Sequence, residues 1–458
     1  MQMRIMAEST ESLGSIGKKY LKDLANLFRY SFVAPDYIEV DLRASQLVKR
    51  TERLTIKFQV LRNGLNQNDS INVNTFGYRR YNWLDWIIGI TSLINWLRAL
   101  ILIYTSSETL AIILGDPLFR SKDRQIIILC ALTILSTMII FREWILNLEA
   151  KGNLKILSIW KCCRNGFDPV HLQMNNVNTS RFRLIVICVS IVAYCTMLVS
   201  PLFLSVTYFT VILCNPWMYK IPELAFYCFF WSLSNIFISS FLLNAILGFS
   251  WYLLCTLSFH LYRLIDLLNT ADYLINSTKG ALNERKIKLF SLIIIRRLNS
   301  FELTASKLRY ILFYYVFVFA SFGDVYIFLG IIVRVYNDFF ADLVATLGIF
   351  ILPSIGVFGL IFGNFISALD KLIVRLNQLT LNNRLSLKTS SKVLEVMDRV
   401  AGPYNGIKLG DFLTIEKSFF IFFILENIST LMLFTVNIGP LINRYINKYS
   451  NKASISSM

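Results

Sequence analysis

The sequence predicts an all-α membrane protein with seven transmembrane helices, a cytoplasmic N-terminus, an extracellular C-terminus and cytosolic helical extensions. Three observations support this fold class. The 458 residues are 55% hydrophobic and 16% charged, whereas soluble proteins carry about 25% charged residues. Seven apolar runs reach the length of roughly 20 residues that a helix needs to cross a bilayer. Lysine and arginine are concentrated in alternate connecting segments.

The seven apolar runs follow a segment of about 80 residues that contains no long apolar run, so we expect no cleaved signal peptide. This pattern divides the chain into a cytosolic N-terminal segment (1–82), six transmembrane helices (83–362), a cytosolic helical segment (363–418), a seventh helix (419–442) and an extracellular tail (443–458). The runs cover residues 83–104, 125–144, 184–206, 224–249, 310–335, 339–362 and 419–442.

The distribution of positive charge predicts the orientation. Of 46 Lys and Arg residues, 37 fall in the segments on the same side as the N-terminus and 8 fall on the other side, with Arg98 inside the first helix. Lys and Arg accumulate on the cytoplasmic side of membrane proteins. The net charge of +17 is therefore explained by topology, and we expect no nucleic-acid partner.

Several inner segments continue the spanning helices into the cytosol. Residues 251–274, 291–315, 370–380 and 390–402 carry apolar residues at three- and four-residue spacing with charges between them, which is typical of amphipathic helices. Solvated juxtamembrane helices are one interpretation. Because four apolar faces need to be buried, the sequence favours a common cytosolic bundle shared between subunits.

The seventh run is unusual because it carries polar residues. Intramembrane charge is costly and usually faces a bundle interior or water. Spacings of 4, 7 and 4 place four residues on one helical stripe, with Phe434 on the same side; the four are Glu426, Thr430, Asn437 and Leu441. The stripe fits two interpretations, a polar helix–helix interface and a pore lining. In a pore, Thr430 and Asn437 would form polar rings, Phe434 or Leu441 a constriction, and Glu426 would favour cations.

A second polar group falls in the outer halves of helices three to six. Aromatic walls with a few polar groups are typical of a small-molecule pocket. Interfacial anchoring or simple packing is the alternative for the aromatic residues, whereas a carboxylate at the depth of Asp324 needs a donor or water. The candidate ligand-binding residues are Tyr208, Trp231, Asn235, Asp324, Tyr326 and Asp342.

The sequence gives no sign of catalysis. The two histidines, His171 and His260, are far apart with no ligand cluster, so we expect no metal site. No phosphate loop and no nucleophile–base arrangement is present, and we expect neither an enzyme nor a cofactor. The adjacent Cys162 and Cys163 are interpreted as reduced thiols, with palmitoylation as the alternative.

This topology resembles the insect chemoreceptor superfamily of gustatory and odorant receptors. Gustatory receptors carry Thr-Tyr, five hydrophobic residues and then Gln-Phe in helix seven. This chain has Thr430-Leu431, then MLFTV, then Asn437-Ile438. The threonine is kept, an amide stands in place of glutamine, and both aromatic residues are aliphatic. The run VMDRVAGPYNGIKLGDFLTI at 396–415 also looks like the segment before helix seven in these receptors.

The resemblance implies a tetrameric, ligand-gated, non-selective cation channel of the plasma membrane of sensory neurons, acting in taste perception. Helix seven of each subunit would line the pore, and the cytosolic extensions would form an anchor domain. The implied partners are a small tastant, monovalent and divalent cations, membrane lipids and identical or related subunits. Residues 396–415 and the carboxylates of Asp324 and Asp342 favour a sugar slightly over a bitter compound.

Other receptor classes fit less well. An odorant-receptor-type channel would share this architecture, but Thr430 and Asn437 favour the gustatory branch. A G-protein-coupled receptor has the opposite orientation, and the chain lacks the Asp/Glu-Arg-Tyr triplet after helix three and an outer pair of cysteines. A transporter built from repeated halves is disfavoured because no internal repeat is detectable.

Overall fold

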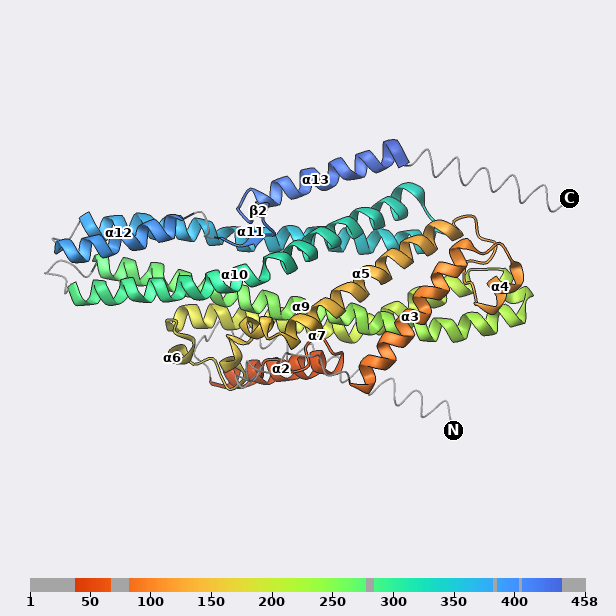
Figure 1. Ribbon diagram of the computed structural model, residues 1–458, viewed down its shortest axis with the longest axis horizontal. Helices are drawn as coiled ribbons and strands as arrows, with labels where there is room; N and C mark the ends of the chain where they lie inside the picture. Colours follow the sequence, from red (N-terminus) through yellow and green to blue (C-terminus); the bar gives the residue numbers. More distant parts are fainter. Residues whose placement is uncertain (1–37, 67–81, 277–283, 382–384, 403–405, 439–458) are drawn as a thin grey trace.

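The computed structural model describes residues 38–66, 82–276, 284–381, 385–402 and 406–438, and these residues form a long helical bundle (Figure 1). The predicted all-α class is confirmed for this part of the chain, where a single two-residue strand pair interrupts the helices. In chain order the elements are α2 (Ile38–Lys57), α3 (Trp83–Tyr104), α4 (Glu108–Ile113), α5 (Arg124–Ala150), η1 (Asn153–Ser158), η2 (Lys161–Arg164), α6 (Pro169–Leu172), α7 (Asn176–Leu213), α8 (Trp217–Lys220), α9 (Pro222–Asn276), α10 (Glu284–Ile327), η3 (Phe328–Val333), α11 (Asp338–Leu381), α12 (Leu387–Ala401), β1 (Lys408–Leu409), β2 (Leu413–Thr414), α13 (Phe419–Leu433) and η4 (Phe434–Ile438).

Among the residues that the structure describes, seven helices are long and apolar enough to cross a membrane, as predicted. They are α3, α5, α7, α9, α10 with η3, α11, and α13 with η4. The structure does not itself indicate on which side of a membrane either end of the chain lies. The starts of α3 and α13, at Trp83 and Phe419, agree with the predicted runs, whereas α5, α7, α9, α10 and α11 extend beyond them.

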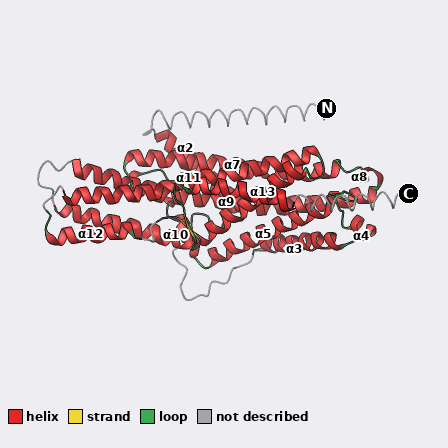
Figure 2. Ribbon diagram, turned by 90° about the horizontal axis from the view of Figure 1, so that it is seen from above, coloured by secondary structure: helices red, strands yellow, loops and turns green. Residues whose placement is uncertain are grey.

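The predicted inner extensions are continuous with the spanning helices. Helix α9 runs for 55 residues, and α10 and α11 run for 44 residues each. At 1.5 Å per residue α9 is about 80 Å long, far more than a bilayer is thick. Its inner part packs with those of α10 and α11, and α12 packs against α10 and α11 at the same end of the molecule (Figures 1 and 2).

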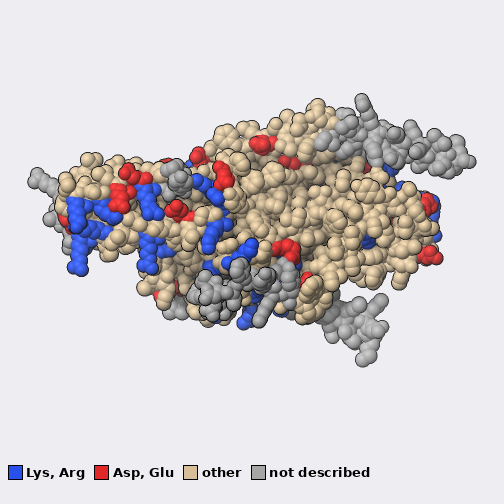
Figure 3. Space-filling model, viewed as in Figure 1, with Lys and Arg blue, Asp and Glu red and all other residues tan. Residues whose placement is uncertain are grey.

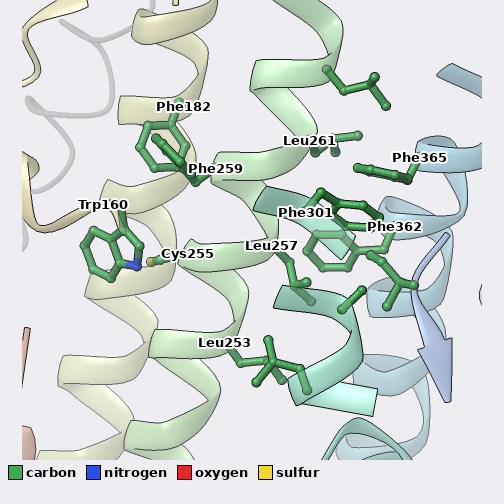
Figure 4. Packing of buried hydrophobic residues seen from close by; sticks show 14 of the residues in the cluster. Trp160, Phe182, Leu253, Cys255, Leu257, Phe259, Leu261, Phe301, Phe362 and Phe365 are labelled. Carbon is green, nitrogen blue, oxygen red and sulfur yellow. The ribbon is translucent and has the colours of Figure 1, made fainter. Parts of the chain in front are cut away.

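The largest hydrophobic core lies in this inner half. Trp160 is fully buried, its ring centroid lies 5.2 Å from that of Trp251, and its Nε1 donates to Thr256 Oγ1 at 3.1 Å. On the other side of α9, Phe301 of α10 stacks on Phe365 of α11 with 4.0 Å between the ring centroids (Figure 4). Large aromatic side chains from several helices therefore join the extensions into one body.

A segment without a long apolar run, which the sequence did not identify as part of the core, joins this body. After α2, the chain turns at Gln59 and buries Val60, Leu61 and Leu65, each no more than 2% exposed. The Glu149 carboxylate of α5 accepts hydrogen bonds from the backbone amides of Arg62 and Asn63 at 2.9 and 3.0 Å. The segment from Phe58 to Asn66 is called the inner loop below.

Buried charges connect the inner loop with the first two spanning helices. Asp85 of α3 is 3% exposed and forms ion pairs with Arg62 of the inner loop and with Arg142 of α5, the latter at 3.0 Å. Arg142 also donates to the side chain of Gln59 at 3.0 Å. Each charge is therefore compensated although it is removed from water, which is the condition for burying a charge.

The surface divides into charged and uncharged zones. In Figure 3, lysine and arginine gather over the end formed by α10 and α12, and a broad uncharged zone covers the part where the seven apolar helices run together. Many large apolar side chains in that zone are exposed, among them Leu93 of α3, Leu202 of α7 and Phe350 of α11. An apolar outer surface of this kind fits contact with lipid.

Candidate functional site

The helix α13 lies at the edge of the bundle, along α10 and α11 (Figure 1). Only 11% of its most apolar stretch is buried, the lowest share among the seven candidate spans, which range up to 61%. Its contacts use aromatic residues against glycines. A Cβ added at Gly359 of α11 would lie 2.2 Å from the Phe419 ring, so glycine is required for this close approach.

The buried side of α13 is formed by Phe423 and Asn427, 8% and 6% exposed. The Asn427 side-chain amide donates to the Phe423 carbonyl, so this buried polar group is satisfied within its own helix. Half-buried Leu431 continues the same side one turn further. Asn427 is therefore a packed residue and lies away from the exposed polar surface.

Two predicted pore residues share an exposed surface of α13. Glu426 and Asn437 are both exposed and eleven residues apart, which is about three helical turns. Thr430 lies between them, is half-buried and donates to the Glu426 carbonyl at 2.9 Å. Leu441, the fifth predicted pore residue, lies outside the described residues. Glu426, Thr430 and Asn437 are called the polar stripe below.

Phe434 follows Thr430 by four residues, is half-buried and contacts the π-helical turn η3. Its ring packs edge-on against Phe328 with 5.6 Å between the centroids. Both residues begin π-helical turns, η4 and η3, which are rare and occur often at functional sites. In the single chain, Phe434 is thus turned into the bundle, and a pore constriction at this residue would require α13 to rotate.

Asp324 lies one turn before Phe328 on the same face of α10, toward α11 and α13. It is 4% exposed, and its Oδ1 has no hydrogen-bond partner among the described residues. Helices α10 and α11 approach each other closely here, since a Cβ added at Gly348 would lie only 2.7 Å from the carbonyl oxygen of Gly323. Burying an unpaired carboxylate costs free energy. A hydrogen-bond donor or a proton at Asp324 would remove this cost.

Tyr326, only two residues further, points to another side of α10. It lies within electrostatic range of Tyr208 of α7 and Cys130 of α5. The Tyr208 hydroxyl lies 3.3 Å from the hydroxyl of Ser239 in α9. The structure therefore brings Tyr208 and Tyr326 together but places Asp324 on the side of the candidate pore helix.

Trp231 meets a residue that was not selected from the sequence. The guanidinium carbon of Arg98 lies over the Trp231 ring at 5.0 Å from its centroid, and Arg98 interacts electrostatically with Tyr208. Arg98 is 7% exposed and donates through Nε to the Leu114 carbonyl at 2.6 Å. A buried arginine in an apolar run was itself the signal that could have identified this site.

The remaining two pocket candidates differ from each other. Asn235 follows Trp231 by one turn of α9 and is half-buried, in keeping with a place beside the aromatic cluster. Asp342 is exposed, and Thr346 donates to its backbone carbonyl at 2.7 Å. Gly348 of α11 lies level with Gly323 and Asp324 of α10. Asp342 precedes Gly348 by six residues, which is about 9 Å along the helix. The two carboxylates are therefore not brought together.

The connection between α3 and α5 covers this cluster. Arg98 holds the carbonyls of Leu114 and Gly115 at the end of α4. Buried Asp116 pairs with Arg124 at the start of α5. The Asn215 side chain donates to the Pro117 carbonyl at 3.0 Å. These bonds fix the connection over the ends of α3, α7 and α9.

No protein-family model matches the chain, and no curated protein is significantly similar to it.

Proposed function

We propose that this chain is a subunit of a ligand-gated cation channel of the gustatory receptor type, in which α13 of several copies surrounds a pore. The proposal combines the resemblance of the helix-seven residues with the position of α13. The copies would be four identical subunits, or this chain together with related subunits, in the plasma membrane of sensory neurons.

The observation that carries the proposal is the polar stripe on the helix that its own chain covers least. Exposed Glu426 and Asn437 would face hydrocarbon if one copy stood alone in a bilayer. An unsatisfied polar group there costs several kcal/mol. Water in a central pore, or polar contacts between copies, removes this cost. A pore accommodates the Glu426 carboxylate best, since a ring of carboxylates repels itself unless water and cations are present.

The proposed gate uses the contact between the two π-helical turns. Phe328 and Phe434 join α10 to the pore helix, and Asp324 lies one turn below on the same face. A ligand can shift this arrangement only by binding the open state more tightly than the closed state. Movement of α10 would release Phe434, and α13 would rotate or move outward to hydrate the pore.

The proposed ligand site is the cluster of Tyr208, Trp231 and Tyr326 with Arg98. Arg98 Nη1 makes no hydrogen bond to the described part of the chain, although Nε and Nη2 do. An arginine donor above an aromatic ring suits a small ligand with oxygen acceptors, either a sugar or an oxygenated bitter compound. Because Tyr326 and Asp324 lie on the same helix, binding here would act directly on α10.

The proposal can be tested with the purified full chain in planar bilayers, using glucose, fructose, sucrose and caffeine as probes. We expect cation currents with one of these probes and a changed unitary conductance in Asn437→Ala. Thr435→Val is the matched control, because exposed Thr435 lies on the opposite flank of α13. Arg98→Lys should weaken activation and leave the unitary conductance unchanged.

Two results would contradict the proposal. Equal conductance in the wild type and in several Asn437 variants would place the polar stripe outside the pore. A C-terminal epitope that is accessible only after permeabilisation, with the N-terminal epitope accessible in intact cells, would reverse the charge-based orientation and remove the gustatory receptor assignment with it.

A further inference from the structure

A β-hairpin precedes the candidate pore helix and lies beside α10. Strands β1 and β2 pair in antiparallel fashion, with Lys408 opposite Thr414 and Leu409 opposite Leu413. Gly410 begins the connection with a φ of +62°, a backbone conformation that favours glycine. Its amide donates to the Arg309 carbonyl of α10 at 2.9 Å.

The two sides of the hairpin differ sharply in burial. Ile407, Leu409 and Ile415 are no more than 2% exposed and pack into the main core. Phe412 at the tip is 83% exposed, and Leu413 is 58% exposed. The inner side therefore fixes the hairpin to the bundle, while its tip presents two large apolar side chains to the surroundings.

The tip continues an exposed aromatic row on α10. The Phe412 ring centroid lies 6.2 Å from that of Phe313, which stacks on Phe317 at 5.7 Å. Phe313 and Phe317 are 36% and 61% exposed and lie within the apolar run 310–335. In a membrane this part of α10 faces hydrocarbon. Phe412 extends the same surface by about one turn toward the inner end.

Charged and polar side chains lie in the hairpin and in the neighbouring parts of α10 and of the segment before α13. Asp411 is held by Arg309 at 2.8 Å and by the Tyr310 hydroxyl at 2.8 Å, so its charge is compensated. Lys307 and Lys417 are exposed and have no ion pair among the described residues. Lys307 of α10 precedes the apolar run that begins at Tyr310, and Lys417 lies two residues before α13 begins at Phe419. Exposed Glu416 is the opposing charge at the edge.

We propose that Phe412 and Leu413 insert into the inner leaflet and that Lys307 and Lys417 bind the headgroup of an anionic phospholipid. Apolar residues with adjacent lysines favour such a surface, because each lysine near an anionic bilayer adds to the attraction. The hairpin passes directly into α13, so bound lipid would set the position of the candidate pore helix. This inference rests on the seven spans and the proposed orientation, and it does not require channel activity.

The test uses the full chain reconstituted with two photoactivatable lipids, phosphatidylserine and phosphatidylcholine, that carry the same diazirine near the glycerol. Mass spectrometry then maps the labelled peptides. We expect phosphatidylserine to label 406–417 and 303–313 more strongly than phosphatidylcholine, while both label the spans equally. Lys307→Gln with Lys417→Gln should reduce this excess about fivefold for each lysine. Phe412→Ser should reduce labelling of the hairpin by both lipids.

The control removes two exposed lysines elsewhere, with Lys286→Gln on α10 and Lys388→Gln on α12, and should leave the labelling unchanged. Equal labelling of the hairpin by both lipids would exclude selective binding of anionic lipid. Protection of the hairpin from both lipids, with the spans still labelled, would mean that another copy covers it. Absence of labelling in the spans would instead contradict the membrane assignment on which the proposed function also depends.

Discussion

The buried ion pairs at the inner end of α3 give the sharpest stability prediction. Asp85→Asn removes the carboxylate that is paired with Arg142 at 3.0 Å and with Arg62. The side chains of Asp85 and Arg142 are 0% and 2% exposed, so water cannot replace the lost partner. Removing one partner of a buried pair costs about 3–5 kcal/mol. Arg142 keeps its hydrogen bond to Gln59 and its ion pair with Glu143 at 2.7 Å, and both favour the lower end of this range.

The assay is unfolding of the purified chain in mixed micelles with increasing SDS, followed by tryptophan fluorescence. The matched control is Glu108→Gln, which removes a carboxylate from an outer pair with Arg120 whose side chains are 60% and 42% exposed. An exposed pair contributes about 0–1 kcal/mol, so the midpoint should hardly move. The midpoint of Asp85→Asn should fall well below that of the control.

A double variant separates the charge from the shape of the site. Asp85→Asn combined with Arg142→Gln removes both charges of the Asp85–Arg142 pair, so its loss of stability should be smaller than the sum of the two single losses. Equal midpoints for Asp85→Asn and Glu108→Gln would refute the reasoning, because they would mean that solvent reaches Arg142 in the folded protein.

Three further outcomes follow from the described contacts. Glu426→Gln should lower the preference for cations over anions several-fold in bilayer recordings, and unchanged reversal potentials would remove Glu426 from the pore. Phe328→Ala should weaken ligand activation while leaving unitary conductance intact, since it removes the contact with Phe434. An unchanged dose response would mean that this contact does not transmit gating from α10 to α13. Cys162 should be alkylated by maleimide with a half-maximal rate near pH 7, read out by peptide mapping, because a hydrogen bond from Cys163 lowers its pKa to about 7 against the opposing effect of burial. A half-maximal rate near pH 9 would show that this hydrogen bond is not made.

Local sequence pattern was sufficient to predict the spanning helices and their inner extensions. The apolar runs at α3 and α13 start where the helices start, and the amphipathic spacing of 251–274 belongs to the uninterrupted α9. The two-residue strands of the hairpin and the buried inner loop were not predicted. Neither segment has a periodic pattern of apolar residues. In the inner loop, Leu61 and Leu65 are buried by contacts with residues that are distant in sequence.

The candidate site was predicted in composition more than in arrangement. Helical spacing places Glu426, Thr430 and Asn437 together, but it cannot tell which other helix contacts this side of α13, so the contact of Phe434 with Phe328 was not predicted. Depth alone grouped Asp324 with Tyr326, although two residues along a helix turn a side chain to nearly the opposite face. The sequence analysis treated Arg98 only as one of the positive charges. Its role in the site became apparent only from its contacts with Trp231 and with the carbonyls of Leu114 and Gly115.

The small share of α13 that its own chain buries has a consequence for biogenesis. Among the described helices α13 is synthesised last, after the other six spans and the inner extensions can complete their mutual contacts. If copies of the chain assemble as proposed, folding of the single chain and association of the copies are therefore separable steps. Until the copies associate, Glu426 and Asn437 stay uncovered on the surface of α13.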